Sequence, residues 1–235
     1  MTLRGATAAG GHCLTLKFRI YPRIRRLAGK LAHLNDRQPV VLALPRGGVA
    51  VGFEVAQALN APLDIVLVRK IGVPWQRELA LGAVTDGASP EIFIDRDMAA
   101  VLDIPESYVQ EATVRQLDEI ERRRRTYCAG RPPLEITGRT AIVVDDGIAT
   151  GATMQVAIRA VRRRGPARLV LAVPVAPPET LTAFAKEADE TICLDMPAAL
   201  GAIGHYYRDF HQMSDAEVTD LLARATRSTG TPPAP

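Results

Sequence analysis

Five short apolar runs, each bounded by turn residues, constrain the fold of this chain more than any other feature of its sequence. They cover residues 40–44, 64–68, 79–84, 141–144 and 169–175. Uninterrupted runs of valine, isoleucine and leucine of this length are typical of strands buried on both faces of a parallel sheet. Helical patterns lie between and after them, at about 20–34, 49–59, 105–127, 153–164, 178–187 and 215–225. We therefore predict an α/β protein with a doubly wound, mainly parallel five-stranded sheet.

The sequence between its two ends is predicted to form one domain. The chain has 235 residues and contains no internal repeat or low-complexity linker, so we expect a single domain over residues 17–226. Residues 1–16, rich in glycine, alanine and threonine, and the proline-containing residues 227–235 are predicted to be disordered.

Composition argues against several classes of protein. The chain is 47% hydrophobic and 23% charged, which is typical of a globular domain. Its 29 basic and 26 acidic residues nearly balance, so charge gives no reason to expect a nucleic-acid partner. No segment approaches the ~20 apolar residues that span a membrane. Cys13, Cys128 and Cys193 show no disulfide or zinc spacing. We expect a cytoplasmic protein.

The most informative motif is DDGIATGAT, residues 145–153, which follows one apolar run and precedes a helical pattern. Its small residues let backbone N–H groups approach an anion, and the helix adds the positive end of its dipole. The carboxylates of Asp145 and Asp146 suit sugar hydroxyls and water held by a divalent cation. A phosphorylated sugar would satisfy both halves. Taken separately, acidic pairs and glycine-containing helix caps occur in many folds.

Two further strand ends carry groups suited to anions. The run at 40–44 is followed by PRGG, in which Arg46 offers a fixed charge and Gly47 and Gly48 permit unusual backbone conformations. The run at 64–68 is followed by Arg69 and Lys70, which we expect at the same sheet edge. The alternative interpretation is that these two are ordinary surface cations.

The stretch VVDDGIATGATM resembles the phosphoribosyl-pyrophosphate (PRPP) motif of type I phosphoribosyltransferases. Residues from about 38 to 222 resemble an uncharacterised branch of that family, through ALPRGG, VRKIG, ELALGAV, AVPVA and GHYYRDFHQMSDAEV. The resemblance implies that Asp145 and Asp146 hold the ribose. It implies a PRPP-binding set that comprises Arg46, Gly47, Gly48, Arg69, Lys70, Asp145, Asp146, Gly147, Ile148, Ala149, Thr150, Gly151, Ala152 and Thr153.

The same resemblance implies Mg²⁺ as cofactor, held mainly by PRPP with water-mediated help from Asp145 and without a dedicated protein ligand. It also implies a cis peptide beside Arg46 or Gly47. Residues 71–79 correspond to a mobile loop that closes over the site, with Arg77 and Glu78 as candidate catalytic residues. Trp75 in that loop either covers the site or belongs to the core.

Two segments are expected to elaborate the family core. A helical insertion at about 103–128 contains ERRRR, residues 121–125, which we interpret as a solvated, salt-bridged face or a dimer contact. A C-terminal hood at about 195–226 is built mainly from residues 195–212 with the N-terminal helix. The hood's aromatic residues, which either stack on an acceptor ring or pack a helix, are His205, Tyr206, Tyr207 and Phe210.

The function that follows from the resemblance is transfer of the 5-phosphoribosyl group from PRPP to an acceptor, expected to be a nucleobase, with release of pyrophosphate. Nucleotide salvage and a homodimer are the corresponding expectations. Two alternatives stay open. One is a regulatory protein that senses PRPP or a nucleotide without turnover, and the other is an enzyme whose acceptor is not a nucleobase.

Overall fold

The computed structural model describes residues 23–87, 90–207 and 211–228. Its centre is a five-stranded parallel sheet with the strand order β2-β1-β6-β7-β8. The strands are β1 (Pro39–Ala43), β2 (Leu63–Ile65), β6 (Thr140–Val144), β7 (Arg168–Val175) and β8 (Glu190–Asp195). The predicted α/β fold with a mainly parallel five-stranded sheet is confirmed.

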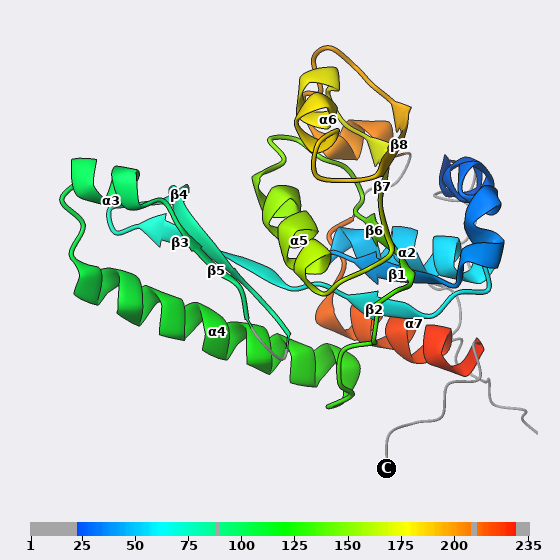
Figure 1. The fold of residues 1–235 in the computed structure, drawn as a ribbon, viewed down its shortest axis with the longest axis horizontal. Coiled ribbons are helices and arrows are strands. Elements are labelled where there is room, and N and C mark those ends of the chain that lie inside the picture. Colours follow the sequence, from blue (N-terminus) through cyan, green and yellow to red (C-terminus); the bar gives the residue numbers. More distant parts are fainter. Residues whose placement is uncertain (1–22, 88–89, 208–210, 229–235) are drawn as a thin grey trace, which may run out of the picture.

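Helices cover both faces of this sheet, as a doubly wound fold requires (Figure 1). One face carries α2 (Gly47–Ala58) and α7 (Asp215–Ser228), and the other carries α5 (Ala152–Arg163) and α6 (Pro178–Phe184). The alternation along β1 explains the two cores, because Val41 faces the α2 side and Leu42 the α5 side. A helical segment at 23–30 and the 3-10 helix η1 (Ala32–Arg37) precede β1.

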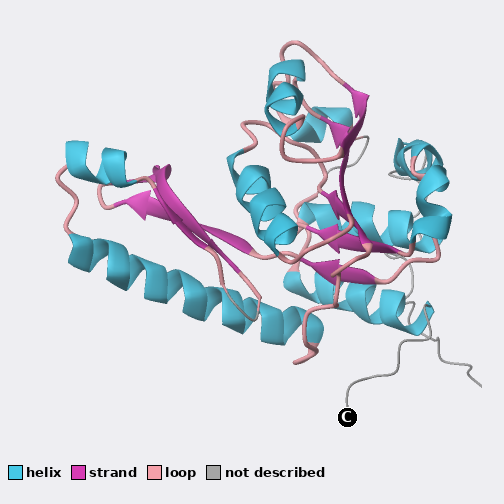
Figure 2. Cartoon of the chain, in the orientation of Figure 1, coloured by secondary structure: helices cyan, strands magenta, loops and turns pink. Residues whose placement is uncertain are grey.

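The part of the chain that connects β2 to β6 forms a separate arm, which projects from the central sheet (Figure 2). It consists of an antiparallel sheet of β3 (Val68–Val73), β4 (Gln76–Thr85) and β5 (Ile92–Ile94), followed by α3 (Arg96–Val101) and α4 (Glu106–Cys128). The 79–84 run was therefore wrongly predicted to join the parallel sheet. Only Pro74 and Trp75 separate β3 from β4, and so short a connection permits only an antiparallel pair.

The fifth strand of the central sheet is β8, which the apolar pattern did not reveal. It lies at the edge next to β7, and of its six residues only Ile192 is buried. An edge strand that is largely accessible needs no continuous apolar run. Its start is fixed by Asp189, whose carboxylate accepts a hydrogen bond from the Leu169 backbone N–H at 2.6 Å.

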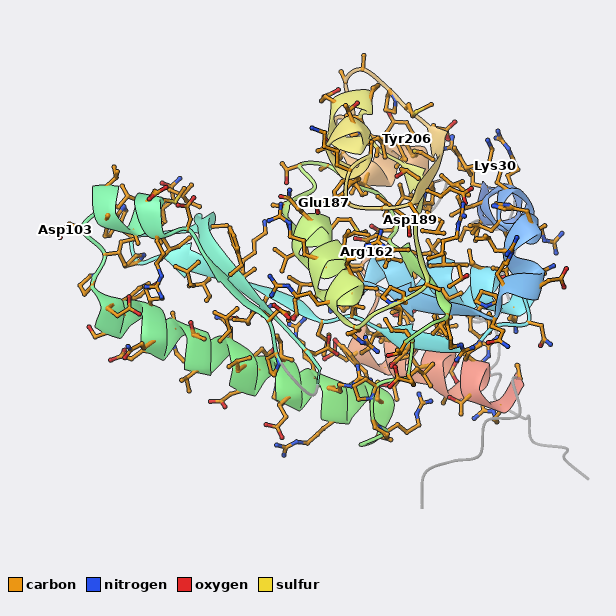
Figure 3. The ribbon with its side chains drawn as sticks, viewed as in Figure 1. Lys30, Asp103, Arg162, Glu187, Asp189 and Tyr206 are labelled. Carbon is orange, nitrogen blue, oxygen red and sulfur yellow. The ribbon has the colours of Figure 1, made fainter. Side chains whose placement is uncertain are left out.

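The helix α5 is fastened to the segment before β8 by ion pairs along its outer side (Figure 3). Arg162 Nη1 donates to Asp189 Oδ2 at 2.9 Å, and its Nη2 donates to the Glu187 backbone carbonyl at 3.0 Å. Arg159 Nη2 donates to Glu187 Oε1 at 2.7 Å. These contacts join α5, whose first turn contains the end of the DDGIATGAT motif, to the segment before β8.

The arm is joined to the central sheet through Arg124, whose side chain is only 12% exposed. Arg124 of α4 donates to both carboxylate oxygens of Asp64 in β2, at 2.9 and 3.1 Å, and to Asp86 Oδ2 at 2.6 Å. Its neighbours Arg122 and Arg123 pair with Glu119, as expected for a solvated face. The interpretation of the whole ERRRR run as a solvated face is therefore wrong for Arg124, which connects α4 to β2 and to Asp86. Within the described ranges, no helix is both long and apolar enough to cross a membrane.

Candidate active site at the carboxyl edge of the sheet

The acidic pair and the PRGG loop meet at the carboxyl ends of the adjacent strands β6 and β1. A Cβ atom at Gly47 would lie 1.8 Å from Asp146 Oδ2, and one at Gly48 would lie 2.9 Å from Asp145 Oδ1. A side chain at Gly48 would also meet the Asp145 backbone, and one at Gly47 would displace the Asp146 carboxyl group, so this close approach favours glycine at both positions. The peptide bond between Pro45 and Arg46 is cis, where the resemblance led us to expect one.

The two carboxyl groups carry a strong electrostatic penalty. Burial, followed by the repulsion of Asp146, raises the pKa of Asp145 well above its usual range. Burial also raises the pKa of Asp146. Backbone N–H groups offset part of this cost: Gly48 donates to Asp145, and the Asp146 N–H donates to Asp145 Oδ1 at 2.8 Å. The pair is thus suited to a ligand that brings hydroxyl donors or positive charge.

The loop after the acidic pair is held by hydrogen bonds to neighbouring elements, while several of its residues are exposed. Buried Ile148 donates its backbone N–H to the Val175 carbonyl at 2.9 Å, and Thr180 Oγ1 donates to the Ala149 carbonyl at 3.0 Å. Gly151 caps α5 with a φ of 81°, a left-handed conformation that favours glycine. Ala149, Thr150 and Ala152 are exposed along this loop. Exposed backbone before a helix N-terminus is a typical site for a phosphate group.

A short segment of the expected hood covers the acidic pair. It contains the 3-10 helix η2 (Ile203–Tyr206), and the Tyr207 hydroxyl next to it donates to the Asp146 backbone carbonyl. A Cβ atom at Gly147 would lie 2.9 Å from Ile203 Cγ2, so this segment packs directly on the loop. Burial, followed by the charge of Asp146, raises the pKa of Tyr207.

The rest of the expected hood lies elsewhere. Helix α7 packs on α2 and α4, and its first residue, Asp215, lies near Arg46 of the PRGG loop. Phe210 lies outside the described residues. His205 is exposed on η2, and Tyr206 stacks near Arg23, whose guanidinium carbon lies 5.8 Å from the ring centroid.

Arg23 and Asp195 are polar residues of this edge that belong to segments expected in the hood, but neither was predicted as a site residue. Arg23 Nη1 donates to Asp195 Oδ2 at 2.7 Å, and Asp195 ends β8 at the same edge as the acidic pair. Recognition of β8 would have identified Asp195, because side chains that follow parallel strands gather at one edge. Arg23 carries no comparable signal, since it lies on the segment before the first strand.

The three predicted anion-binding cations do not converge as expected. Arg46 Nη1 lies 3.9 Å from Asp215 Oδ1. Arg69 and Lys70 belong to β3 of the arm rather than to the end of a parallel strand, and they face opposite ways because strand side chains alternate. Arg69 Nε donates to Gln116 Oε1 on α4 at 3.0 Å, and burial and then the nearby Arg123 lower its pKa.

Lys70 lies on the side of the arm that faces the DDGIATGAT segment. It lines a groove of about 330 Å³ between the arm and α5, together with Ala152 and Thr153 of the first turn of that helix. The structure thus brings Lys70, but not Arg69, towards the DDGIATGAT segment.

The segment expected to be a mobile loop forms a hairpin. Residues 71–73 and 76–79 lie in β3 and β4, and the turn consists of Pro74 and Trp75 alone. The Trp75 side chain is 65% exposed, so the interpretation of this residue as core is wrong. The side chains of Arg77 and Glu78 lie outside the described part of the structure.

The fold and this site define a class of α/β proteins with an acidic pair and an exposed loop before a helix N-terminus at one sheet edge. Comparison with known proteins identifies the family. The family model described as the phosphoribosyl transferase domain matches residues 92–208. The crystal structure of TT1426 from Thermus thermophilus is 41% identical, with a TM-score of 0.73, and the match covers 88% of this chain and 99% of that protein. The chain belongs to the phosphoribosyltransferase family.

Two curated Mycobacterium tuberculosis proteins, from strains CDC 1551 and H37Rv, are also similar to this chain. Each is 45% identical over 203 residues, and each is named as a predicted phosphoribosyl transferase. The match covers 86% of this chain but 45% of each relative. The chain therefore spans less than half the length of these relatives.

Proposed function

We propose that the protein transfers the 5-phosphoribosyl group of PRPP to an acceptor, with release of pyrophosphate, and that the acceptor is a nucleobase. The observation that carries this proposal is the junction of Gly47 and Gly48 with Asp145 and Asp146, directly beside an exposed loop and helix N-terminus. One edge thereby combines groups suited to pyrophosphate, to ribose and to a 5′-phosphate.

Residues 147–153 hold the 5′-phosphate in this proposal. Their backbone N–H groups and the positive end of the α5 dipole favour an anion, and Thr150 and Thr153 add hydroxyl donors. Because the loop is pinned through Ile148 and Ala149, the phosphate is bound by a site that needs little rearrangement.

Asp145 and Asp146 bind the ribose hydroxyls and stabilise the positive charge that develops at C1 as pyrophosphate departs. Their pKa values, raised by burial, make the ionised pair costly without a ligand, and both hydroxyl donors and developing positive charge lower that cost. No side chain acts as a nucleophile, because the acceptor attacks C1 directly. The pair therefore acts by electrostatic stabilisation.

The pyrophosphate is received by residues 46–48 with Lys70, and Arg69 joins only if its bond to Gln116 opens. Mg²⁺ prefers oxygen ligands, and the Asp145 carboxyl group lies beside that of Asp146, so these residues fit a hydrated Mg²⁺. Among the described residues, no three His, Cys, Asp or Glu side chains gather into a metal site. We propose that PRPP would supply most of the ligands of Mg²⁺, with water-mediated help from Asp145, and that the bound ion would offset the charge of the leaving pyrophosphate.

Closure and acceptor choice are assigned to the two flanking segments. Arg77 and Glu78 on the hairpin approach the site when the arm closes, which excludes water that would hydrolyse the activated sugar. Tyr206 and Tyr207 line the acceptor side, because η2 packs on Gly147. We further propose a cytoplasmic homodimer that acts in nucleotide salvage, and sedimentation analysis tests the dimer.

The proposal is tested by mixing PRPP, MgCl₂ and a panel of purine and pyrimidine bases and measuring pyrophosphate release. Turnover with one base supports it. Asp145→Asn combined with Asp146→Asn should abolish turnover and weaken PRPP binding, whereas Asp220→Asn, an exposed carboxylate of α7, should change neither. Tight PRPP binding without turnover for any base would favour a sensor, and unchanged PRPP affinity in the double variant would refute the site.

A further inference from the structure

The Arg46 side chain, in the proposed pyrophosphate loop, faces a carboxylate from a helix that lies outside the site. Arg46 Nη1 is 3.9 Å from Asp215 Oδ1, and the two side chains are 34% and 46% exposed. That distance is too long for a direct hydrogen bond, and ion pairs exposed to this degree are weak. An incoming anion can therefore draw the Arg46 side chain away from Asp215.

Asp215 is held in place by α4 rather than by Arg46. The Tyr127 hydroxyl donates to Asp215 Oδ1 at 2.6 Å, the same oxygen that faces Arg46. Burial, followed by this hydrogen bond, raises the pKa of Tyr127 to about 12, so the hydroxyl keeps its proton. Val218 and Leu222 are fully buried on the same helix and fix its position. Asp215 is thus a fixed negative charge beside a partly exposed guanidinium.

We infer that Asp215 is a counter-ion of Arg46 that competes with the anion bound by residues 45–48 and limits the affinity of this loop for pyrophosphate. The inference rests on the proposed function, in which Arg46 receives the pyrophosphate end of PRPP. A pyrophosphate group carries more charge than one carboxylate and can accept two hydrogen bonds from a guanidinium, so it takes Arg46 over from Asp215. Tyr127 moderates the competition because its hydroxyl occupies the oxygen that faces Arg46. A limited affinity favours release of the product pyrophosphate.

Two substitutions should change the affinity in opposite directions, measured by titration calorimetry with magnesium pyrophosphate and with PRPP. Asp215→Asn removes the competing charge, and we expect it to tighten pyrophosphate binding about two- to fivefold, the range for an exposed ion pair. Tyr127→Phe frees the carboxylate oxygen and should weaken binding by a similar factor. A damaged fold does not bind its ligand more tightly, so the gain in Asp215→Asn separates competition from structural disturbance.

Matched variants assign the effect to the pair. Asp220→Asn removes another carboxylate from α7, one that pairs with Arg224 at 3.3 Å, and should bind as the wild type does. In an Arg46→Gln background, Asp215→Asn should have no effect. Unchanged or weaker binding by Asp215→Asn, or a gain that persists without Arg46, overturns the inference. A wild type that binds neither PRPP nor pyrophosphate overturns the proposed function itself, which is a different result.

Discussion

Asp145 and Asp146 have the central role in the proposed binding of PRPP, although burial disfavours their charged forms. The structure places both carboxyl groups against backbone, with Gly47 and Gly48 leaving no space between. Burial raises the pKa of each, and for Asp145 the neighbouring carboxyl adds to the effect. A carboxyl whose pKa is raised in the folded state stabilises the fold most at low pH, and this contribution is lost as pH rises through the folded-state pKa.

Asp145→Asn should therefore stabilise the protein at neutral pH while it weakens PRPP binding. We expect the free energy of unfolding at pH 7.5 to rise by about 0.5–2 kcal/mol, the usual range for a single stabilising substitution. The gain should shrink at pH 4, where the wild-type carboxyl is protonated. Urea unfolding at the two pH values measures this. A variant that is less stable than the wild type at pH 7.5 would show that the carboxylate is better compensated than its surroundings indicate.

Candidate site residues could be predicted from the sequence where they lie in a short motif at the end of a strand. The DDGIATGAT and PRGG motifs lie directly after their strands, so strand polarity alone brings Asp145 and Gly47 to one edge. Asp215 and Tyr127 are far apart in the chain and meet only because α7 packs on α4. Side chains that approach the site through tertiary packing leave no pattern of spacing, which is why neither was predicted.

At the scale of elements, the arm depends on the buried contact of Arg124 with Asp64 and Asp86. Arg124→Met leaves two buried carboxylates without their cation, and loss of one partner of a buried pair costs about 3–5 kcal/mol. Burial already raises the pKa of Asp86 despite Arg124, so the variant should recover part of its stability as pH falls and the Asp86 carboxyl group becomes protonated. Urea unfolding at pH 8 and pH 5 measures both effects.

Arg125→Met is the matched control for that experiment, because Arg125 is the next residue of α4 and pairs with Glu121 at the exposed surface. It should cost less than about 1 kcal/mol, as exposed pairs do. Equal losses in the two variants would mean that the buried network contributes nothing beyond an ordinary surface pair.

Elements were predictable in proportion to how deeply they are buried. β1, β6 and β7 are almost entirely buried, and each appeared as a continuous apolar run. β8 is an edge strand and was missed. The run at 79–84 is apolar because β4 packs against both α4 and α5, and periodicity does not distinguish such a strand from one of the central sheet.

At the scale of the whole molecule, the arm carries the only tryptophan of the sequence, Trp75, at the turn between β3 and β4. This side chain is 65% exposed, and it should become less accessible if the hairpin closes over bound PRPP. We expect saturating PRPP with MgCl₂ to shift Trp75 fluorescence to shorter wavelength and to reduce its quenching by acrylamide. The Asp145→Asn, Asp146→Asn double variant should show no response. Unchanged quenching in a wild type that binds PRPP would show that the arm does not close.

The close contact between the glycine loop and the acidic pair also has a consequence for inhibition. A compound held by the backbone of residues 46–48 would meet few side chains that mutation could alter. Replacement of Gly47 by any other residue places a Cβ atom on the Asp146 carboxyl group, so a resistant variant would damage its own site. Resistance to such a compound would have to arise at more distant positions, where each substitution would weaken inhibitor binding less.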